Sequence, residues 1–129
     1  MTNRDWSYLK DRYGIETART KFQKICETLF RKMNNGENVQ SIKCYPGDEG
    51  IDIYIGEIGL EPIIVIQCKY FHENINESQK NQIRKSFKKA VESKEFEMRE
   101  WILCLPTELG LKENKWWCDW KSKQSFKNH

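Results

Sequence analysis

Asp52, Gln67 and Lys69 are the residues whose types and spacing could perform chemistry. Asp52 stands at the head of a short apolar run, residues 51–55, while Gln67 and Lys69 stand together at the end of the next run, residues 63–71. A carboxylate and a second oxygen ligand can hold a divalent cation such as Mg²⁺, which prefers oxygen ligands. A neighbouring lysine supplies a fixed positive charge to a phosphate under attack. The trio predicts metal-dependent hydrolysis of a phosphodiester bond.

Alternation along a strand supports this interpretation. Gln67 and Lys69 project from one face of a strand, and Cys68 between them turns to the other. Burying a glutamine and a lysine in such an apolar run costs several kcal/mol unless partners are present, and Asp52 on the neighbouring strand is the expected partner. Alternatively, Asp52 only accepts backbone hydrogen bonds and Lys69 is an exposed strand-end lysine. Asp48 and Glu49, in the preceding turn, are weaker candidates for the ligand.

The elements that must position these residues follow from hydrophobic periodicity and from turn residues. Helices are expected at 14–33, 76–93 and 112–123, and strands at 39–45, 51–55, 63–70 and 101–105. The order is therefore αβββαβα. The strand at 63–70 is apolar on both faces and should be central. A helical crossover joins it to the last strand, which implies a parallel pair in a mixed sheet covered by helices on both faces.

Composition limits the class of protein. The 129 residues fit a single domain, 1–129, with one hydrophobic core. No apolar run approaches the roughly 20 residues that span a bilayer, so we expect a soluble cytoplasmic protein without a membrane partner. The five scattered cysteines form no CxxC pair, which favours reduced structural thiols over a zinc or redox site.

Net charge is only +3, but the positive charges are grouped. Lys80, Arg84 and Lys88 recur every four residues and form one ridge of the second helix. Such a ridge could contact nucleic-acid phosphates, or it could be a solvated helix surface. The segment 115–123 interleaves three tryptophans with lysines; these rings could stack on bases, but helical spacing favours core packing for Trp116 and Trp120.

These motifs resemble those of a known family. The pairing of GDEGID (47–52) with QCK (67–69), between a first helix and a basic helix, resembles the PD-(D/E)xK nuclease superfamily, in particular its Mrr-like restriction endonuclease branch. The resemblance covers residues 13–106. It implies a restriction-endonuclease-like α/β fold with a mixed sheet flanked by helices, and an Mg²⁺-dependent endonuclease, with Mn²⁺ as a substitute, acting on double-stranded DNA.

The resemblance also implies further site residues. The Cys68 carbonyl often ligates the metal in this family, and the second helix lies near the nucleic acid. The first helix usually adds an acid, but here Phe22 is followed by Gln23. Glu27, one turn further on nearly the same face, is the expected substitute, and Glu16 is a weaker one.

The expected activity is cleavage of double-stranded DNA, in defence against foreign DNA. The segment 86–110 also resembles nuclease effector domains at the N-termini of larger bacterial anti-phage proteins, so a larger parent polypeptide or a homo-oligomer is expected. Two alternatives stay open. One is a non-cleaving nucleic-acid-binding or assembly module that keeps the nuclease fold. The other is a nuclease for structured DNA, such as a Holliday junction, or for RNA.

Overall fold

A computed structural model of the chain describes residues 14–42, 51–71 and 75–124. The described elements are α2 (Ile15–Met33), β1 (Val39–Ser41), β2 (Ile53–Ile55), β3 (Ile63–Cys68), α3 (Glu77–Glu92), β4 (Met98–Cys104) and α4 (Leu111–Ser122). The predicted order αβββαβα is confirmed. Within the described residues, no helix is both long enough and apolar enough to cross a bilayer.

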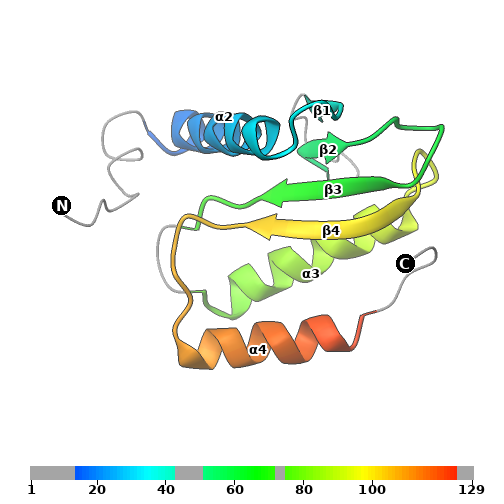
Figure 1. Cartoon of the computed structure of the whole chain (residues 1–129). Coiled ribbons are helices and arrows are strands. Elements are labelled where there is room, and N and C mark those ends of the chain that lie inside the picture. The colour runs from blue at the N-terminus through cyan, green and yellow to red at the C-terminus, as the bar shows by residue number, and fades with distance from the viewer. Residues whose placement is uncertain (1–13, 43–50, 72–74, 125–129) are drawn as a thin grey trace.

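The four strands form one mixed sheet in the order β1-β2-β3-β4. β1 and β2 pair antiparallel, as do β2 and β3, whereas β3 and β4 pair parallel. β3 is central, as its apolar sequence predicts, because residues Ile63 to Gln67 are buried on both faces of the sheet. Figure 1 shows α3 connecting β3 to β4, the crossover that a parallel pair requires.

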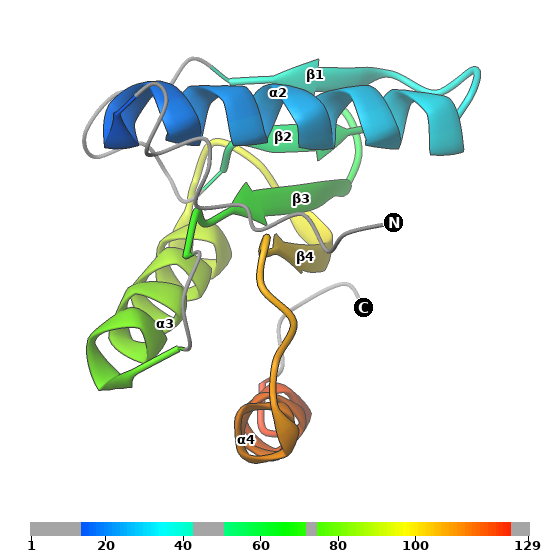
Figure 2. The same ribbon diagram turned by 90° about the vertical axis from the view of Figure 1, so that its left-hand side faces the viewer.

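Helices cover both faces of this sheet. On one face α2 buries Ala18, Phe22 and Cys26 against the strands. On the other face, Phe87 and Ala90 of α3 pack against Val65 and its neighbours, and α4 adds Trp120. Figure 2 shows α2 on one side of the strands, with α3 and α4 on the other. The predicted mixed, helix-covered sheet is confirmed.

Local signals explain two helix ends. α3 begins with a capping box in which the Asn76 side chain accepts from Gln79 N, while the Gln79 side chain accepts from Asn76 N. α2 ends at Met33 and is capped by Asn34, whose backbone N–H and side-chain amide both donate to the Phe30 carbonyl.

The boundaries of all four strands differ from the prediction: β2 begins at Ile53 rather than at residue 51, and β3 ends at Cys68 rather than at residue 70. β4 begins at Met98 rather than at residue 101, because the exposed pair Arg99 and Glu100 interrupts the apolar pattern while Met98 is buried against the α3 face. β1 ends at Ser41, and the predicted continuation beyond residue 42 lies outside the described residues.

Candidate active site

Asp52 lies immediately before β2, where backbone pairing holds it between its neighbours. Its carbonyl accepts from Ile42 N at 2.7 Å, and its own N–H donates to the Ile66 carbonyl at 3.2 Å. The antiparallel register of β2 and β3 therefore brings the Asp52 side chain beside the end of β3. Neighbouring antiparallel strands lie about 4.8 Å apart, so side chains at adjacent strand ends can touch.

The Asp52 carboxylate contacts the end of β3 directly. Its Oδ2 accepts two hydrogen bonds, one from Gln67 Nε2 and one from the backbone N–H of Cys68, both at 2.8 Å. A carboxylate that accepts charge-assisted hydrogen bonds is held firmly in place. The structure thus brings together two of the three residues that the sequence singled out, and joins them by a direct hydrogen bond.

Gln67 is buried, with 6% of its surface exposed. Its Nε2 donates to Asp52, while its Oε1 is a buried acceptor that has no hydrogen-bond partner among the described residues. A buried carbonyl oxygen without a partner costs about 1–3 kcal/mol, and such an atom needs an explanation. A hard cation is one partner that would satisfy it, because Mg²⁺ accepts neutral amide oxygens as ligands.

Lys69 directly follows β3 and is half-buried. Burial lowers the pKa of the Lys69 ammonium below its ordinary value of 10.5, because the charged form loses hydration. The negative charge of Asp52 opposes this shift, while the positive charges of Lys89 and Arg19 add to it. Asp52 is therefore close enough for its charge to act on the Lys69 ammonium, as the predicted trio requires.

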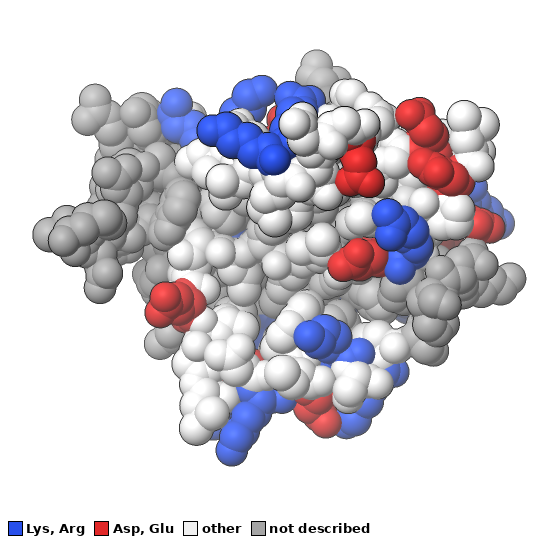
Figure 3. All heavy atoms as spheres, viewed as in Figure 1, with Lys and Arg blue, Asp and Glu red and all other residues white. Residues whose placement is uncertain are grey.

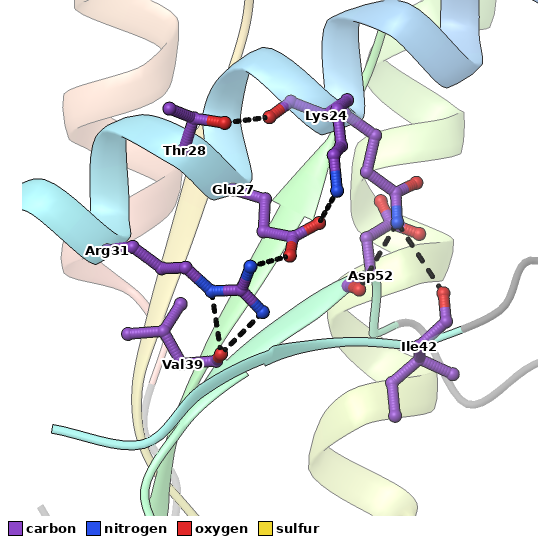
Figure 4. A network of polar contacts seen from close by, with 8 residues as sticks. Lys24, Glu27, Thr28, Arg31, Val39, Ile42 and Asp52 are labelled. Carbon is purple, nitrogen blue, oxygen red and sulfur yellow. Dashed lines mark hydrogen bonds and ion pairs between the residues drawn. The ribbon is translucent and has the colours of Figure 1, made fainter.

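Glu27, the predicted acid of the first helix, is buried with an exposed fraction of 5%. Its carboxylate forms ion pairs within α2, at 2.7 Å with Arg31 Nη1 and at 3.8 Å with Lys24 Nζ. Arg31 also donates to the Val39 carbonyl of β1. Figure 4 shows Glu27 between these two cations with Asp52 nearby. No contact joins Glu27 to Asp52, Gln67 or Lys69 among the interactions of the described residues.

Gln23 is the side chain of α2 that does contact the Asp52 segment. Its Nε2 donates to the Asp52 carbonyl at 3.3 Å and lies 3.5 Å from the Ile42 carbonyl. A signal for this contact was present in the sequence, because Gln23 stands at the position where the resembling family carries its helix acid. The weaker candidate Glu16 is exposed and pairs with Arg19. Asp48 and Glu49 lie outside the described residues.

A comparison with protein-family models finds the restriction endonuclease family of the Mrr catalytic type over residues 16–102. The match spans more than half of the chain and includes Asp52, Gln67 and Lys69. The chain belongs to this family. The predicted resemblance to Mrr-like nucleases is therefore confirmed. Neither the curated proteins nor the solved structures contain a significant match.

As a member of the restriction endonuclease family, the chain belongs to a class of nuclease hydrolases that act on DNA and generally use divalent metal ions. The donor set at the end of β3 fits such an ion. The Asp52 carboxylate, the unpartnered Gln67 Oε1 and the Cys68 carbonyl are all hard oxygen groups at one strand end.

The predicted basic ridge of this Mrr family member is partly engaged with α4. Lys80 Nζ lies 5.2 Å from the centre of the Trp116 ring, and the Arg84 guanidinium lies 5.5 Å from it. Arg84 also pairs with Glu77 at 3.1 Å. Lys88, the third member of the ridge, is exposed. Two of the three cations therefore lie over an aromatic ring, where the ring face attracts them.

The tryptophans of α4 are half-buried rather than fully in the core. Trp120 packs edge-on against Phe87 of α3, with ring centres 5.3 Å apart, and Trp116 stacks on Trp120 at 6.0 Å. None of the α4 residues is fully buried. The predicted inward packing is therefore correct for Trp120, while Trp116 lies between the core and the cations of α3.

Proposed function

We propose that this domain is a metal-dependent endodeoxyribonuclease that hydrolyses phosphodiester bonds of double-stranded DNA, in defence against foreign DNA. The observation that carries the proposal is the hydrogen-bonded pair of Asp52 and Gln67 with an unpartnered buried oxygen at the end of β3. Membership of the restriction endonuclease family supports the same activity class.

In this proposal Asp52, Gln67 Oε1 and the Cys68 carbonyl hold the metal ion, Mg²⁺ or Mn²⁺. When bound, the ion supplies a more acidic water and positive charge for the phosphate. Asp52 contributes the only formal negative charge of these three groups. Because glutamine replaces an acid, the set carries less charge than a pair of carboxylates would, and the expected affinity for Mg²⁺ without DNA is modest.

Lys69 is the proposed transition-state cation. A lysine ammonium beside the scissile phosphate stabilises negative charge that develops on the phosphate oxygens. Partial burial strengthens such an interaction, because the local dielectric is lower than in water. The same burial removes water from the ammonium in the free protein, which lowers its pKa. An anionic substrate would compensate for that loss.

Lys80, Arg84 and Lys88 are the proposed phosphate contacts. All three lie on α3, which begins shortly after β3 and leads away from the end that carries Gln67. Figure 3 shows further Lys and Arg side chains over α2 and over α4 on the face that it presents. These groups would attract DNA through electrostatic steering, while the ridge on α3 fixes the register of the backbone.

Glu27 remains the proposed acid of the first helix, acting from one turn beyond Gln23. Its carboxylate is bound by Arg31 and Lys24 in the free protein. Taking part in the metal site would require Glu27 to exchange at least one of these ion pairs for a water or metal contact. Its role is therefore tested separately below from that of Asp52.

Incubation of supercoiled plasmid with the protein and Mg²⁺, Mn²⁺ or EDTA tests the proposal. We expect nicked or linear DNA with either metal and intact plasmid with EDTA. Parallel reactions with a four-way junction and with RNA decide between substrates. Binding of duplex DNA without cleavage under any metal condition would contradict the nuclease proposal and identify a non-cleaving module.

A further inference from the structure

Three cysteines from separate elements meet on the face of the sheet that α2 covers. Cys26 lies on α2, Cys68 ends β3 and Cys104 ends β4. Their sulfur atoms all lie within 4.8 Å of one another. In the part of the chain that the structure describes, no other group of three His, Cys, Asp or Glu side chains is this close.

The fold explains why these thiols converge. Cys68 and Cys104 are paired residues in the parallel register of β3 and β4, so their side chains leave the sheet on the same face. Cys26 follows Phe22 by one helical turn and belongs to the stripe of α2 that packs on this face. Cys26 is buried, and the other two thiols are half-buried beside the same apolar cluster.

The thiols also influence one another's protonation. The neighbouring Cys26 and Cys68 thiols lower the pKa of the Cys104 thiol to about 4, and the neighbouring Cys104 raises the pKa of Cys26 to about 12. The inference below depends on the positions of the three sulfur atoms rather than on which of them is ionised.

The spacing suits a three-coordinate metal ion. With a metal–sulfur bond of about 2.3 Å, three sulfurs around one ion in a plane are roughly 4.0 Å apart. The sulfurs of the cluster therefore need to move together by less than about 1 Å. Soft thiolate ligands select soft cations such as Cu⁺, and disfavour Mg²⁺, which requires oxygen.

We propose that Cys26, Cys68 and Cys104 form a binding site for one soft, thiophilic metal ion, with Cu⁺ as the ion that matches three sulfur ligands. Zn²⁺ shares the affinity for thiolate but takes four ligands in closed structural sites, and the cluster offers three. Each of the three groups that still carries its proton releases it to solvent when it binds the ion, because the ligand is the thiolate.

This site is separate from the proposed nuclease centre. Gln67 and Cys68 are consecutive strand residues, so the amide oxygen and the thiol leave β3 on opposite faces. The Gln67 face offers oxygen ligands beside Asp52, and the Cys68 face offers sulfur ligands beneath α2. The two sites would be connected only through the backbone of β3, whose Cys68 N–H donates to Asp52.

The test is a competition titration with Cu⁺ under anaerobic conditions. The starting protein carries Cys44→Ser and Cys118→Ser, so that only the three clustered thiols remain. We expect one equivalent of Cu⁺ to be retained against a competing Cu⁺ chelator, and X-ray absorption to show three sulfur neighbours. Cys26→Ser, Cys68→Ser and Cys104→Ser should each weaken binding at least tenfold. Asp119→Asn, at an exposed position of α4 away from the cluster, is the control and should leave Cu⁺ binding unchanged.

Several results would overturn the proposal. These are failure to compete with the chelator, two sulfur neighbours instead of three, or full affinity in any of the three serine variants. Tighter retention of Zn²⁺ than of Cu⁺ in the same competition would overturn the choice of ion. The X-ray measurement uses the protein with all three thiols intact, so it decides the question even if a serine variant unfolds. Loss of DNA cleavage plays no part in any of these results.

Discussion

The side-chain amide of Gln67 donates from Nε2 to Oδ2 of Asp52 at 2.8 Å, and this contact turns its Oε1 into a buried acceptor without a partner. An ionised carboxylate accepts hydrogen bonds and cannot donate them. The Asp52 carboxylate therefore requires the NH₂ end of the Gln67 amide to face it. The orientation of Gln67 is therefore determined by Asp52, and the oxygen that remains is the one a hard cation would use.

Replacing Asp52 by asparagine removes its charge but keeps an oxygen that can accept from Cys68 N–H. We expect Asp52→Asn to fold and to lose metal-dependent plasmid cleavage by more than about 100-fold, equivalent to about 3 kcal/mol of transition-state stabilisation. Asp52→Ala should in addition lose about 1–3 kcal/mol of stability, because two buried donors lose their acceptor. The control is Asp119→Asn, on exposed α4. Cleavage at the normal rate by Asp52→Asn would remove Asp52 from the catalytic site.

Lys69→Met should abolish cleavage and stabilise the free protein at neutral pH. Burial lowers the folded-state pKa of Lys69 below 10.5, so the unfolded state binds the proton more tightly between the two values. The stability of the normal protein relative to Lys69→Met should therefore rise as pH increases through this window, until the lysine is neutral in both states. Denaturant unfolding of both proteins from pH 7 to about pH 10.5 measures the difference. A constant difference across this range would show that the Lys69 ammonium is as well solvated as in the unfolded chain.

Gln67→Glu should tighten Mn²⁺ binding and lower the stability of the metal-free protein. A second carboxylate replaces the amide donor beside Asp52, so the two negative charges repel each other without an ion and bind the ion more strongly. Calorimetric titration measures the affinity, and thermal unfolding with and without Mn²⁺ measures the stability. Binding stabilises a folded protein in proportion to affinity and ligand concentration, so Mn²⁺ should raise the melting temperature more in the variant. Equal Mn²⁺ affinity in the two proteins would place Gln67 outside the metal's ligand set.

Glu27→Gln should lower both stability and Mn²⁺ affinity if Glu27 is the acid of the first helix. The stability loss should be about 1–2 kcal/mol, because the ion pair is buried at Glu27 but half-exposed at Arg31. Arg31→Gln is the matched control, since it breaks the same ion pair while leaving the carboxylate. Arg31→Gln should lower the stability and leave the Mn²⁺ affinity unchanged. If the Mn²⁺ affinities of Glu27→Gln and Arg31→Gln are equal, Glu27 forms the ion pair with Arg31 and takes no part in metal binding.

Replacing Lys80, Arg84 and Lys88 together by glutamine should weaken DNA binding across all sequences. The dependence of log affinity on log salt should flatten by up to about 2–3 units, because each phosphate contact contributes roughly 0.9 to the slope. Mn²⁺ affinity measured without DNA should not change. The matched control is Lys94→Gln, since exposed Lys94 precedes β4 and so lies at the edge opposite the end of β3. An unaltered salt slope in the triple variant would direct the search for the DNA surface to residues 115–123.

The sequence by itself determined the order of the elements and the pairing of Asp52 with Gln67. Both depend on local rules, since a period of two identifies a strand and the polar interruptions of an apolar strand mark where a partner is needed. The apolar run that forms β3 predicts a central strand, because it lacks a polar face. Asp52, Gln67 and Lys69 could therefore be grouped before any three-dimensional information was used.

The tertiary structure alone decided which partner each polar group takes. Glu27 and Gln23 are one turn apart on α2, yet Glu27 pairs with Arg31 and Lys24 while Gln23 contacts the Asp52 segment. Helical periodicity gives both residues nearly the same direction, and only the docking angle of α2 on the sheet separates them. The cluster of three thiols could not be predicted from the sequence either, because Cys26, Cys68 and Cys104 are far apart along the chain. Their distance depends on the register of β3 with β4 and on the position of α2, which arise from packing the whole core rather than from any local pattern.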